Sequence, residues 1–210
     1  MCSAYTIRGE PISPFVCDLL GIPNDLRVER KTKLVRPTDT VPVVRVTHVN
    51  YEQLEMRWGL IPAWSKTMPE RPLTNARSET VDELKSFSDA FRKRRCIMPG
   101  AEFFEWVKGT KQRVTFRPKD DEFLFAGMWD SWHDGERTIE SCVMLTTAAN
   151  DLMLPVNDRM PVILRPEDCV KWLNLETPIE ELKRLLVPRA NDLITMVEEI
   201  KPSSNQTSLF

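Results

Sequence analysis

The fold is decided by the stretch from Arg95 to Thr146, which holds five runs of strand-forming residues: RCIM (95–98), FFEWV (103–107), QRVTFR (112–117), FLFAGM (123–128) and TIESCVMLT (138–146). β-Branched and aromatic residues are typical of strands, and the segments between the runs, such as KGTK (108–111) and HDGE (133–136), are typical of turns. Strands joined by such short connections pair antiparallel. The stretch therefore predicts an antiparallel meander.

Outward from this stretch, the chain predicts a further hairpin and several short helices. Residues 41–49 are β-branched and residues 54–58 alternate between apolar and polar, which predicts a hairpin turning near Asn50. Residues 59–75 contain three prolines and are expected to form a long ordered loop. Capping residues and prolines predict helices at 14–20, from Thr80, from Ser88 to the basic cluster 92–95, at 166–173 and at 178–186.

This order of elements predicts an α+β fold in one domain over residues 1–201. We expect mainly antiparallel β-sheet in a barrel-like core, with several short helices around it. A chain of 210 residues buries enough surface to fold without disulfides or a structural metal. Residues 202–210 are rich in Ser, Asn and Gln and are expected to form a mobile tail.

The cysteines and histidines exclude several kinds of site. Five cysteines at positions 2, 17, 96, 142 and 169 fit neither a disulfide framework nor a Cys-x-x-Cys motif, and the two histidines lie 85 positions apart. The longest run without a charged residue has ten residues, which is too short to cross a bilayer. We therefore expect a reduced, cytoplasmic monomer with no cofactor, no metal and no membrane partner.

Charge is divided unevenly along the chain. The whole chain carries 29 basic and 31 acidic residues, a net charge of -2, which argues against a generic polyanion binder. Residues 1–119, however, hold 21 basic and 14 acidic side chains, against 8 and 17 in residues 120–210. Contacts with nucleic acid are thus expected to be local and to come mainly from the first part.

Cys2 is the most suggestive nucleophile. Met1 is readily removed before a small second residue, and a cysteine at the new terminus carries an amine and a thiol on adjacent carbons. Their reference pKa values are about 8 and about 8.5, so both are partly nucleophilic near neutral pH. Such a 1,2-aminothiol closes a thiazolidine ring with an aldehyde. The alternative is that Cys2 is an incidental residue at a frayed terminus.

Four further segments accompany Cys2 in a fixed order. They are WGLIPAW (58–64), TNARSET (74–80), PGAEFFEW (99–106) and LTTAAN (145–150) followed by DRMPVIL (158–164). This series resembles the SRAP family, the SOS-response-associated peptidases or abasic-site-processing proteins. The resemblance runs from Cys2 to about Trp172, and the Asn-Ala-Arg, Phe-Phe-Glu-Trp and Arg-Met-Pro pieces together are specific to that family.

The resemblance implies a sensor of abasic sites in single-stranded DNA, acting in the DNA damage or SOS response near the nucleoid. It implies that Cys2 forms a covalent thiazolidine with the sugar aldehyde and shields the lesion. It implies further that Asn75 orients this cysteine and that Glu105 exchanges protons, a role that a partly buried carboxylate suits. From the residues alone, an ion-pair partner beside Trp106 is the favoured interpretation of Glu105.

The resemblance also assigns DNA contacts. Arg77 and Arg159 match family positions that hold the DNA backbone, and a guanidinium fork suits phosphate. Thr146 is expected to add a hydroxyl donor. Trp64 is either a stacking or wedge surface for the bases beside the lesion or a residue of the core, whereas Trp58 is expected to pack in the core.

Several positions depart from the family pattern. Asn157 stands where the family has a histidine, and an amide cannot carry a proton near neutral pH. Ser3 and Ala4 replace Gly-Arg near the nucleophile, so Ser3 is expected at the DNA interface without the cationic contact. Leu34 replaces an asparagine, and Glu102 replaces a glycine.

Three function classes follow. The first is covalent capture of abasic sites, with lyase and thiol-autopeptidase chemistry as family attributes. The second is a single-stranded DNA-binding homologue whose chemistry is impaired by Asn157. The third is a cysteine peptidase, which the absence of any Cys-His pairing disfavours.

Overall fold

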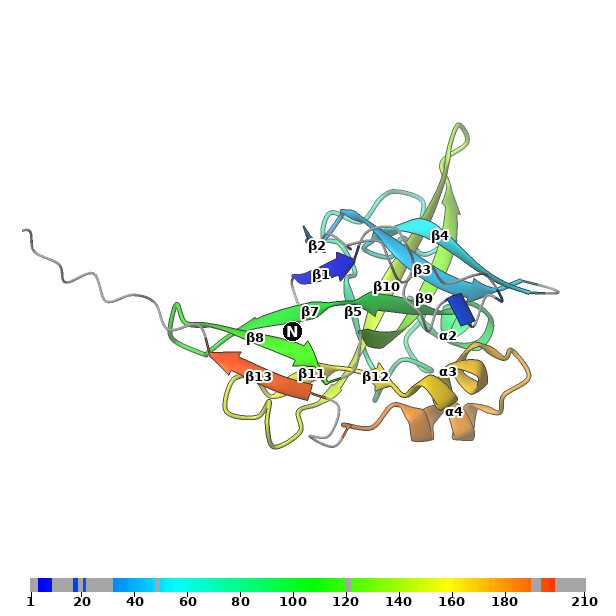
Figure 1. Ribbon diagram of the computed structural model, residues 1–210. Helices are drawn as coiled ribbons and strands as arrows, with labels where there is room; N and C mark the ends of the chain where they lie inside the picture. Colours follow the sequence, from blue (N-terminus) through cyan, green and yellow to red (C-terminus); the bar gives the residue numbers. More distant parts are fainter. Residues whose placement is uncertain are drawn as a thin grey trace, which may run out of the picture.

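The computed structural model describes residues 4–8, 17–18, 21, 32–47, 50–119, 122–189 and 194–198. These residues form two β-sheets with helices gathered beside one of them (Figure 1). The smaller sheet has the strand order β13-β8-β7-β1-β2 and contains β1 (Tyr5–Arg8), β2 (Thr32–Val35), β7 (Glu102–Trp106), β8 (Arg113–Pro118) and β13 (Ile194–Glu198).

The larger sheet forms a barrel-like ring. Its order is β11-β10-β4-β3-β6-β9-β12, and β9 also pairs with β10, which closes the ring of β10, β4, β3, β6 and β9. Its strands are β3 (Thr40–Val46), β4 (Tyr51–Trp58), β5 (Asn75–Arg77), β6 (Arg95–Gly100), β9 (Phe123–His133), β10 (Thr138–Ala148), β11 (Arg159–Pro161) and β12 (Ile163–Leu164). The predicted α+β class with a mainly antiparallel, barrel-like core is confirmed.

Two clusters of buried residues form the core. One lies between the sheets and includes Tyr5, Phe103 and Phe125, whose rings meet edge-on at 5.8 and 6.0 Å. The other lies between the ring and the helices α2 (Ser88–Lys93), α3 (Pro166–Leu173) and α4 (Ile179–Leu185), which appear together at the lower right of Figure 1. Burial of these apolar faces, at roughly 25 cal/mol per Å², is the main stabilising term.

The predicted meander is wrong in one respect: its five strands are shared between the two sheets. β6 pairs with β3 and β9, whereas β7 pairs with β1 and β8. The chain changes sheet at Gly100, where a Cβ atom would lie 2.5 Å from the Phe125 ring. Glycine therefore permits the close approach at the corner, and the corner delivers β7 to the smaller sheet.

Most local predictions are confirmed. The hairpin predicted near Asn50 is formed by β3 and β4, whose pairing runs from Thr40 opposite Arg57 to Val46 opposite Tyr51. Helix α3 covers residues 166–173, as expected. The helix expected from Thr80 is wrong, because residues 78–87 form successive turns instead. The Ser78 N–H donates to the Thr146 carbonyl on β10, so the start of this segment is hydrogen-bonded to a strand instead of to a continuous helix.

Some predictions lie outside the described residues. They concern most of the helix at 14–20 and the tail at 202–210. Conversely, β1, β2 and β13 were not predicted, because these short strands lack a distinct alternating pattern. Among the described residues, no helix is long and apolar enough to span a membrane.

Candidate nucleic-acid interface

Strand β10 brings four of the predicted site residues to one end of the larger sheet. β5 runs parallel to β10, with Asn75 opposite Met144 and Arg77 opposite Thr146. β11 runs antiparallel on the other side, with Arg159 opposite Ala148. Residues about 80 positions apart in the chain thus lie on the two strands that flank the end of β10.

Arg159 is held in a fixed orientation at this end. Its Nη2 donates to the Thr146 carbonyl at 2.7 Å, and its guanidinium makes two hydrogen bonds to the Glu79 carboxylate, at 2.5 and 2.9 Å. Thr146 is fully buried, and its hydroxyl lies 3.3 Å from the same Nη2. Thr146 therefore supports the arginine from behind, while its expected contact with DNA stays a prediction.

Glu105 is a buried carboxylate on β7, with 4% of its surface exposed. Its Oε2 accepts a hydrogen bond from Asn157 Nδ2 at 3.0 Å. Burial raises the pKa of Glu105 above its usual value, because the charged form loses hydration, and the hydrogen bond from Asn157 opposes this rise. The group is thus shifted in the direction that proton exchange near neutral pH requires.

Asn157 connects Glu105 to Arg159. While its Nδ2 donates to Glu105, its Oδ1 accepts from the Arg159 backbone N–H at 3.2 Å. The neighbouring Asp158 lies 3.6 Å from Lys108 Nζ in the turn after β7. These contacts join the two sheets, and the amide at 157 holds the Glu105 carboxylate beside the start of β11.

Asn75 and Arg77 lie along β5 but differ in environment. Asn75 is partly buried and donates from Nδ2 to Thr74 Oγ1 at 3.2 Å. Arg77 is exposed, and its carbonyl accepts from Thr80 N–H, which closes the turn that presents Glu79. The exposed Arg77 lies on β5, across β10 from the strand that carries Arg159, and is accessible to an anion from solvent.

Trp64 and Trp58 have different roles. Trp58 is fully buried and donates from its indole to the Thr74 carbonyl at 3.0 Å, so its expected core position is confirmed. Trp64 is 53% exposed, with Lys85 Nζ 4.5 Å from its ring centroid. Its loop is held by Asp130, which accepts from Ala63 N–H at 2.8 Å. The core alternative for Trp64 is therefore wrong.

Cys2 and Ser3 lie outside the described residues. Ala4 is the nearest described neighbour, and its carbonyl accepts from Phe104 N–H at 3.3 Å. The start of β1 thus runs beside β7, next to Glu105.

The basic cluster at 92–95 is only partly internal to the fold: Arg92 and Lys93 are exposed, whereas Arg94 is half-buried and Arg95 is buried. Arg95 is 1% exposed and donates to four backbone carbonyls, and burial lowers its pKa to about 10. Arg94 pairs with Asp89 and Asp130, and Lys93 with Asp89. Arg95 joins α2 to the end of α3, and Arg94 contacts Asp130, which also holds the Trp64 loop, so these two arginines serve the fold rather than an exposed phosphate-binding surface.

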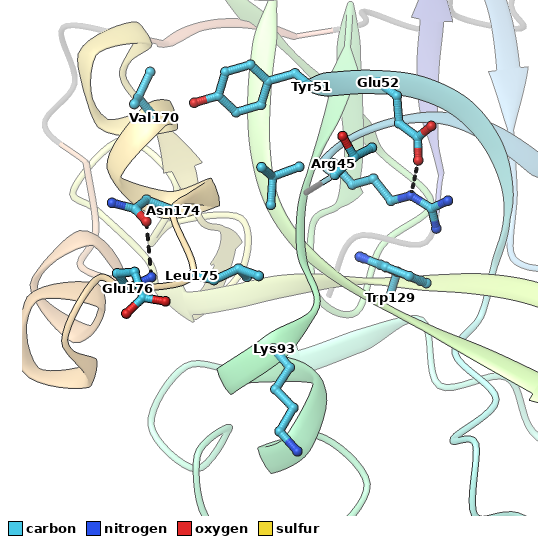
Figure 2. A pocket seen from close by; sticks show the side chains of 11 residues that line it. Arg45, Tyr51, Glu52, Lys93, Trp129, Val170, Asn174, Leu175 and Glu176 are labelled. Carbon is cyan, nitrogen blue, oxygen red and sulfur yellow. Dashed lines mark hydrogen bonds and ion pairs between the residues drawn. The ribbon is translucent and has the colours of Figure 1, made fainter. Parts of the chain in front are cut away.

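A pocket of about 670 Å³ lies elsewhere, between α3 and the β3–β4 hairpin (Figure 2). Tyr51, Trp129 and Leu175 line it, and Arg45 stacks over Trp129 at 4.2 Å while pairing with Glu52. It contains none of the predicted site residues. Among the described residues there is no cluster of His, Cys, Asp and Glu suited to a metal.

Glu79 was missed as a site residue. It lies in the TNARSET segment that carries the resemblance, two positions after Arg77. Its pKa is lowered, first by its hydrogen bond to Arg159. The signal available in the sequence was an acidic residue two positions after the motif's arginine, but its partner Arg159 is 80 positions away.

Comparison with known proteins identifies the family. Residues 1–202 match the model of the SOS response associated peptidase (SRAP) family. The abasic site processing protein YoqW of Bacillus subtilis is 35% identical over 161 residues, which cover 73% of this chain and 72% of YoqW. The abasic site processing protein HMCES of Xenopus tropicalis is 27% identical, covering 65% of this chain and 49% of HMCES.

Solved structures agree. A protein from Bacteroides thetaiotaomicron superposes with a TM-score of 0.73 at 28% identity, over 79% of this chain and 76% of that one. A protein from Bordetella bronchiseptica superposes with a TM-score of 0.77 at 24% identity, over 95% and 100%, which supports the fold. The chain belongs to the SRAP family.

Proposed function

We propose that this protein captures abasic sites in single-stranded DNA by a covalent bond to Cys2, as part of the response to DNA damage in the cytoplasm, at the nucleoid. The observation that carries the proposal is the buried Glu105, with its raised pKa, beside the strand that leads to the N-terminus. The family membership and the names of the relatives, which are abasic site processing proteins, support it.

The proposed reaction releases one water molecule. The α-amine of Cys2, exposed by removal of Met1, attacks C1′ of the ring-opened sugar, and the aldehyde oxygen leaves as water to give an imine. The Cys2 thiol then adds to the same carbon, forming the C–S bond while its proton moves to nitrogen. Glu105 gives a proton to the departing oxygen and takes one back, which its raised pKa favours.

Covalent geometry supports the placement of the nucleophile. Cys2 precedes Ala4 by two residues, so their Cα atoms are at most about 7 Å apart. Ala4 is hydrogen-bonded to Phe104, the residue before Glu105. In the proposal Asn75 orients the cysteine, and Arg77, Arg159 and Thr146 hold the phosphates on either side of the lesion.

Trp64 and Ser3 complete the proposed interface. The exposed Trp64 ring with Lys85 above it offers a stacking surface for a base next to the lesion. Ser3 follows the nucleophile directly and contributes a hydroxyl near the sugar. A protein using these contacts acts as a monomer without metal or cofactor.

Asn157 favours a second candidate function. If proton transfer at this position is required, the protein binds single-stranded DNA without capturing it, because an amide holds Glu105 but carries no proton. Lyase activity belongs to the first candidate function, covalent capture, since strand cleavage would proceed from the same imine intermediate. Peptidase activity toward other proteins is the least supported, since neither histidine lies in the site segments.

Intact mass separates the two candidates. The purified protein is weighed alone and after incubation with a single-stranded oligonucleotide that contains one abasic site. Covalent capture predicts loss of Met1 and a denaturation-resistant adduct, lighter than the sum of its parts by one water, that Cys2→Ala does not form. Binding of the oligonucleotide without any adduct would establish the second candidate instead.

A further inference from the structure

The Glu79 carboxylate occupies the guanidinium group of Arg159, which is the group proposed to bind DNA. Two guanidinium nitrogens of Arg159 face the two carboxylate oxygens of Glu79, at 2.5 and 2.9 Å. A phosphate offers the same pair of oxygen acceptors to the same fork. The carboxylate and a phosphate therefore cannot both be bound in this way.

The two partners of the pair are held unequally. The Arg159 side chain is 14% exposed and is fixed by the Thr146 carbonyl at 2.7 Å, whereas the Glu79 side chain is 50% exposed. Moving Glu79 into solvent restores hydration to a carboxylate that is already half in water. The arginine stays in place, so displacing the carboxylate leaves an oriented fork facing solvent.

A second ion pair in the fold, Arg189–Asp168, has both partners largely buried. Arg189 and Asp168 are only 14% and 21% exposed, and Arg189 also donates to the Ile163 carbonyl at 2.9 Å. Both of those partners are largely removed from water. In contrast, half of the Glu79 side chain is open to solvent, at the edge where Arg77 is exposed.

We propose that Glu79 is an internal competitor for phosphate, which occupies the Arg159 fork in the DNA-free protein and is displaced by a phosphate of the bound strand. The inference rests on the proposed function, because it takes Arg159 as a phosphate contact. It adds a residue that lowers affinity for undamaged single strands. Capture then depends more on the bond to the lesion than on general attraction to DNA.

Two consequences follow for Glu79→Gln, which keeps the shape of the side chain and removes its charge. The variant loses the competition and also the repulsion between the displaced carboxylate and the DNA. We expect it to bind undamaged single-stranded DNA about three- to tenfold more tightly than the unaltered protein at about 0.1 M salt. The displaced carboxylate also takes up a cation, so the salt dependence of Glu79→Gln should be steeper by up to about 0.7 in slope.

The experiment is fluorescence anisotropy with a labelled, undamaged oligonucleotide, titrated at several KCl concentrations. No aldehyde is present, so only non-covalent binding is measured. Glu52→Gln is the matched control: its side chain is 41% exposed and pairs with Arg45 at 2.5 Å in the pocket of Figure 2. It removes the same charge outside the site and should change affinity much less.

A double variant isolates the competition. In an Arg159→Gln background, Glu79→Gln should tighten binding less than twofold, because there is no guanidinium fork for the carboxylate to occupy. Weaker or unchanged binding by Glu79→Gln alone would overturn the inference, since it would make Glu79 a support for Arg159 rather than a competitor. The proposed function is tested separately, by the mass of the adduct with an abasic oligonucleotide, so the two failures are distinguishable.

Discussion

Glu105 and Glu79 lie at opposite ends of one hydrogen-bonded series, Glu105–Asn157–Arg159–Glu79. Glu105 is buried, accepts from a neutral amide, and has a raised pKa. Glu79 is half exposed, accepts from a guanidinium, and has a lowered pKa. The same type of side chain is thus shifted toward keeping its proton at one end and held ionised as a counter-ion at the other.

The largest effect is expected from Glu105→Gln. A glutamine keeps the hydrogen-bonding shape but neither gives nor takes a proton, and general acid–base catalysis contributes about 10²- to 10⁴-fold. We expect the rate of adduct formation with an abasic oligonucleotide to fall at least about 100-fold. Anisotropy with an undamaged oligonucleotide should show unchanged affinity. A normal adduct rate would remove Glu105 from the mechanism.

Arg159→Gln tests the other end of the series. Loss of a charge-assisted phosphate contact should weaken binding of undamaged single-stranded DNA by about tenfold and lower the salt slope by about 0.7. Arg137→Gln is the control, because Arg137 pairs with Asp134 in the β9–β10 turn, at the far end of β10. Equal losses in the two variants would indicate a general charge effect and not a site.

Asn157→His tests the residue in the middle. An imidazole at this position can donate to Glu105 and also carry a proton, so adduct formation or release should accelerate, by about tenfold. The measurement follows adduct formation on an abasic oligonucleotide and its reversal after removal of the free DNA. If both rates stay the same, the proposed cost of asparagine at 157 is wrong.

The smallest effects are on stability, and the two ends should respond to pH with opposite signs. The folded-state pKa of Glu105 is raised, so at pH values between the unfolded and the folded pKa the folded protein holds a proton that the unfolded chain has released. Stability therefore falls as pH rises from the unfolded pKa to the folded pKa. Glu105→Gln lacks this loss. Its Tm should exceed that of the unaltered protein at pH 7, and the difference should vanish near pH 4.

Glu79 should behave in the reverse manner. Its folded-state pKa is lowered, so its pair with Arg159 stabilises the protein above the usual carboxyl pKa, and this contribution is lost as pH falls through the folded pKa. Because the side chain is half exposed, Glu79→Gln should cost at most about 0.5 kcal/mol at pH 7. Calorimetry of both variants from pH 3 to 7 checks the signs. Parallel pH trends would contradict the contrast between the two carboxylates.

Particular residues show where sequence reasoning succeeded and where it did not. α3 was predicted over its full length, because Pro166 at the first helical position and the apolar spacing are local signals. The turns after Thr80 were mistaken for a helix, because their anchor is a hydrogen bond from Ser78 to Thr146, on a distant strand. Arg95 belongs to a basic run in the sequence, but it is buried because two of its four carbonyl partners, Trp172 and Asn174, lie at the distant end of α3.

The sequence by itself determined the fold class, the family motifs and the candidate site residues, since strand runs, turns and motif order are local properties. Only the tertiary structure decided which of these residues meet. β10 places Arg77 and Arg159 on the two strands that flank it, and Asn157 reaches Glu105 from one sheet to the other. Pairing between distant strands sets burial, and burial and partner charge set whether a carboxylate holds a proton or an arginine.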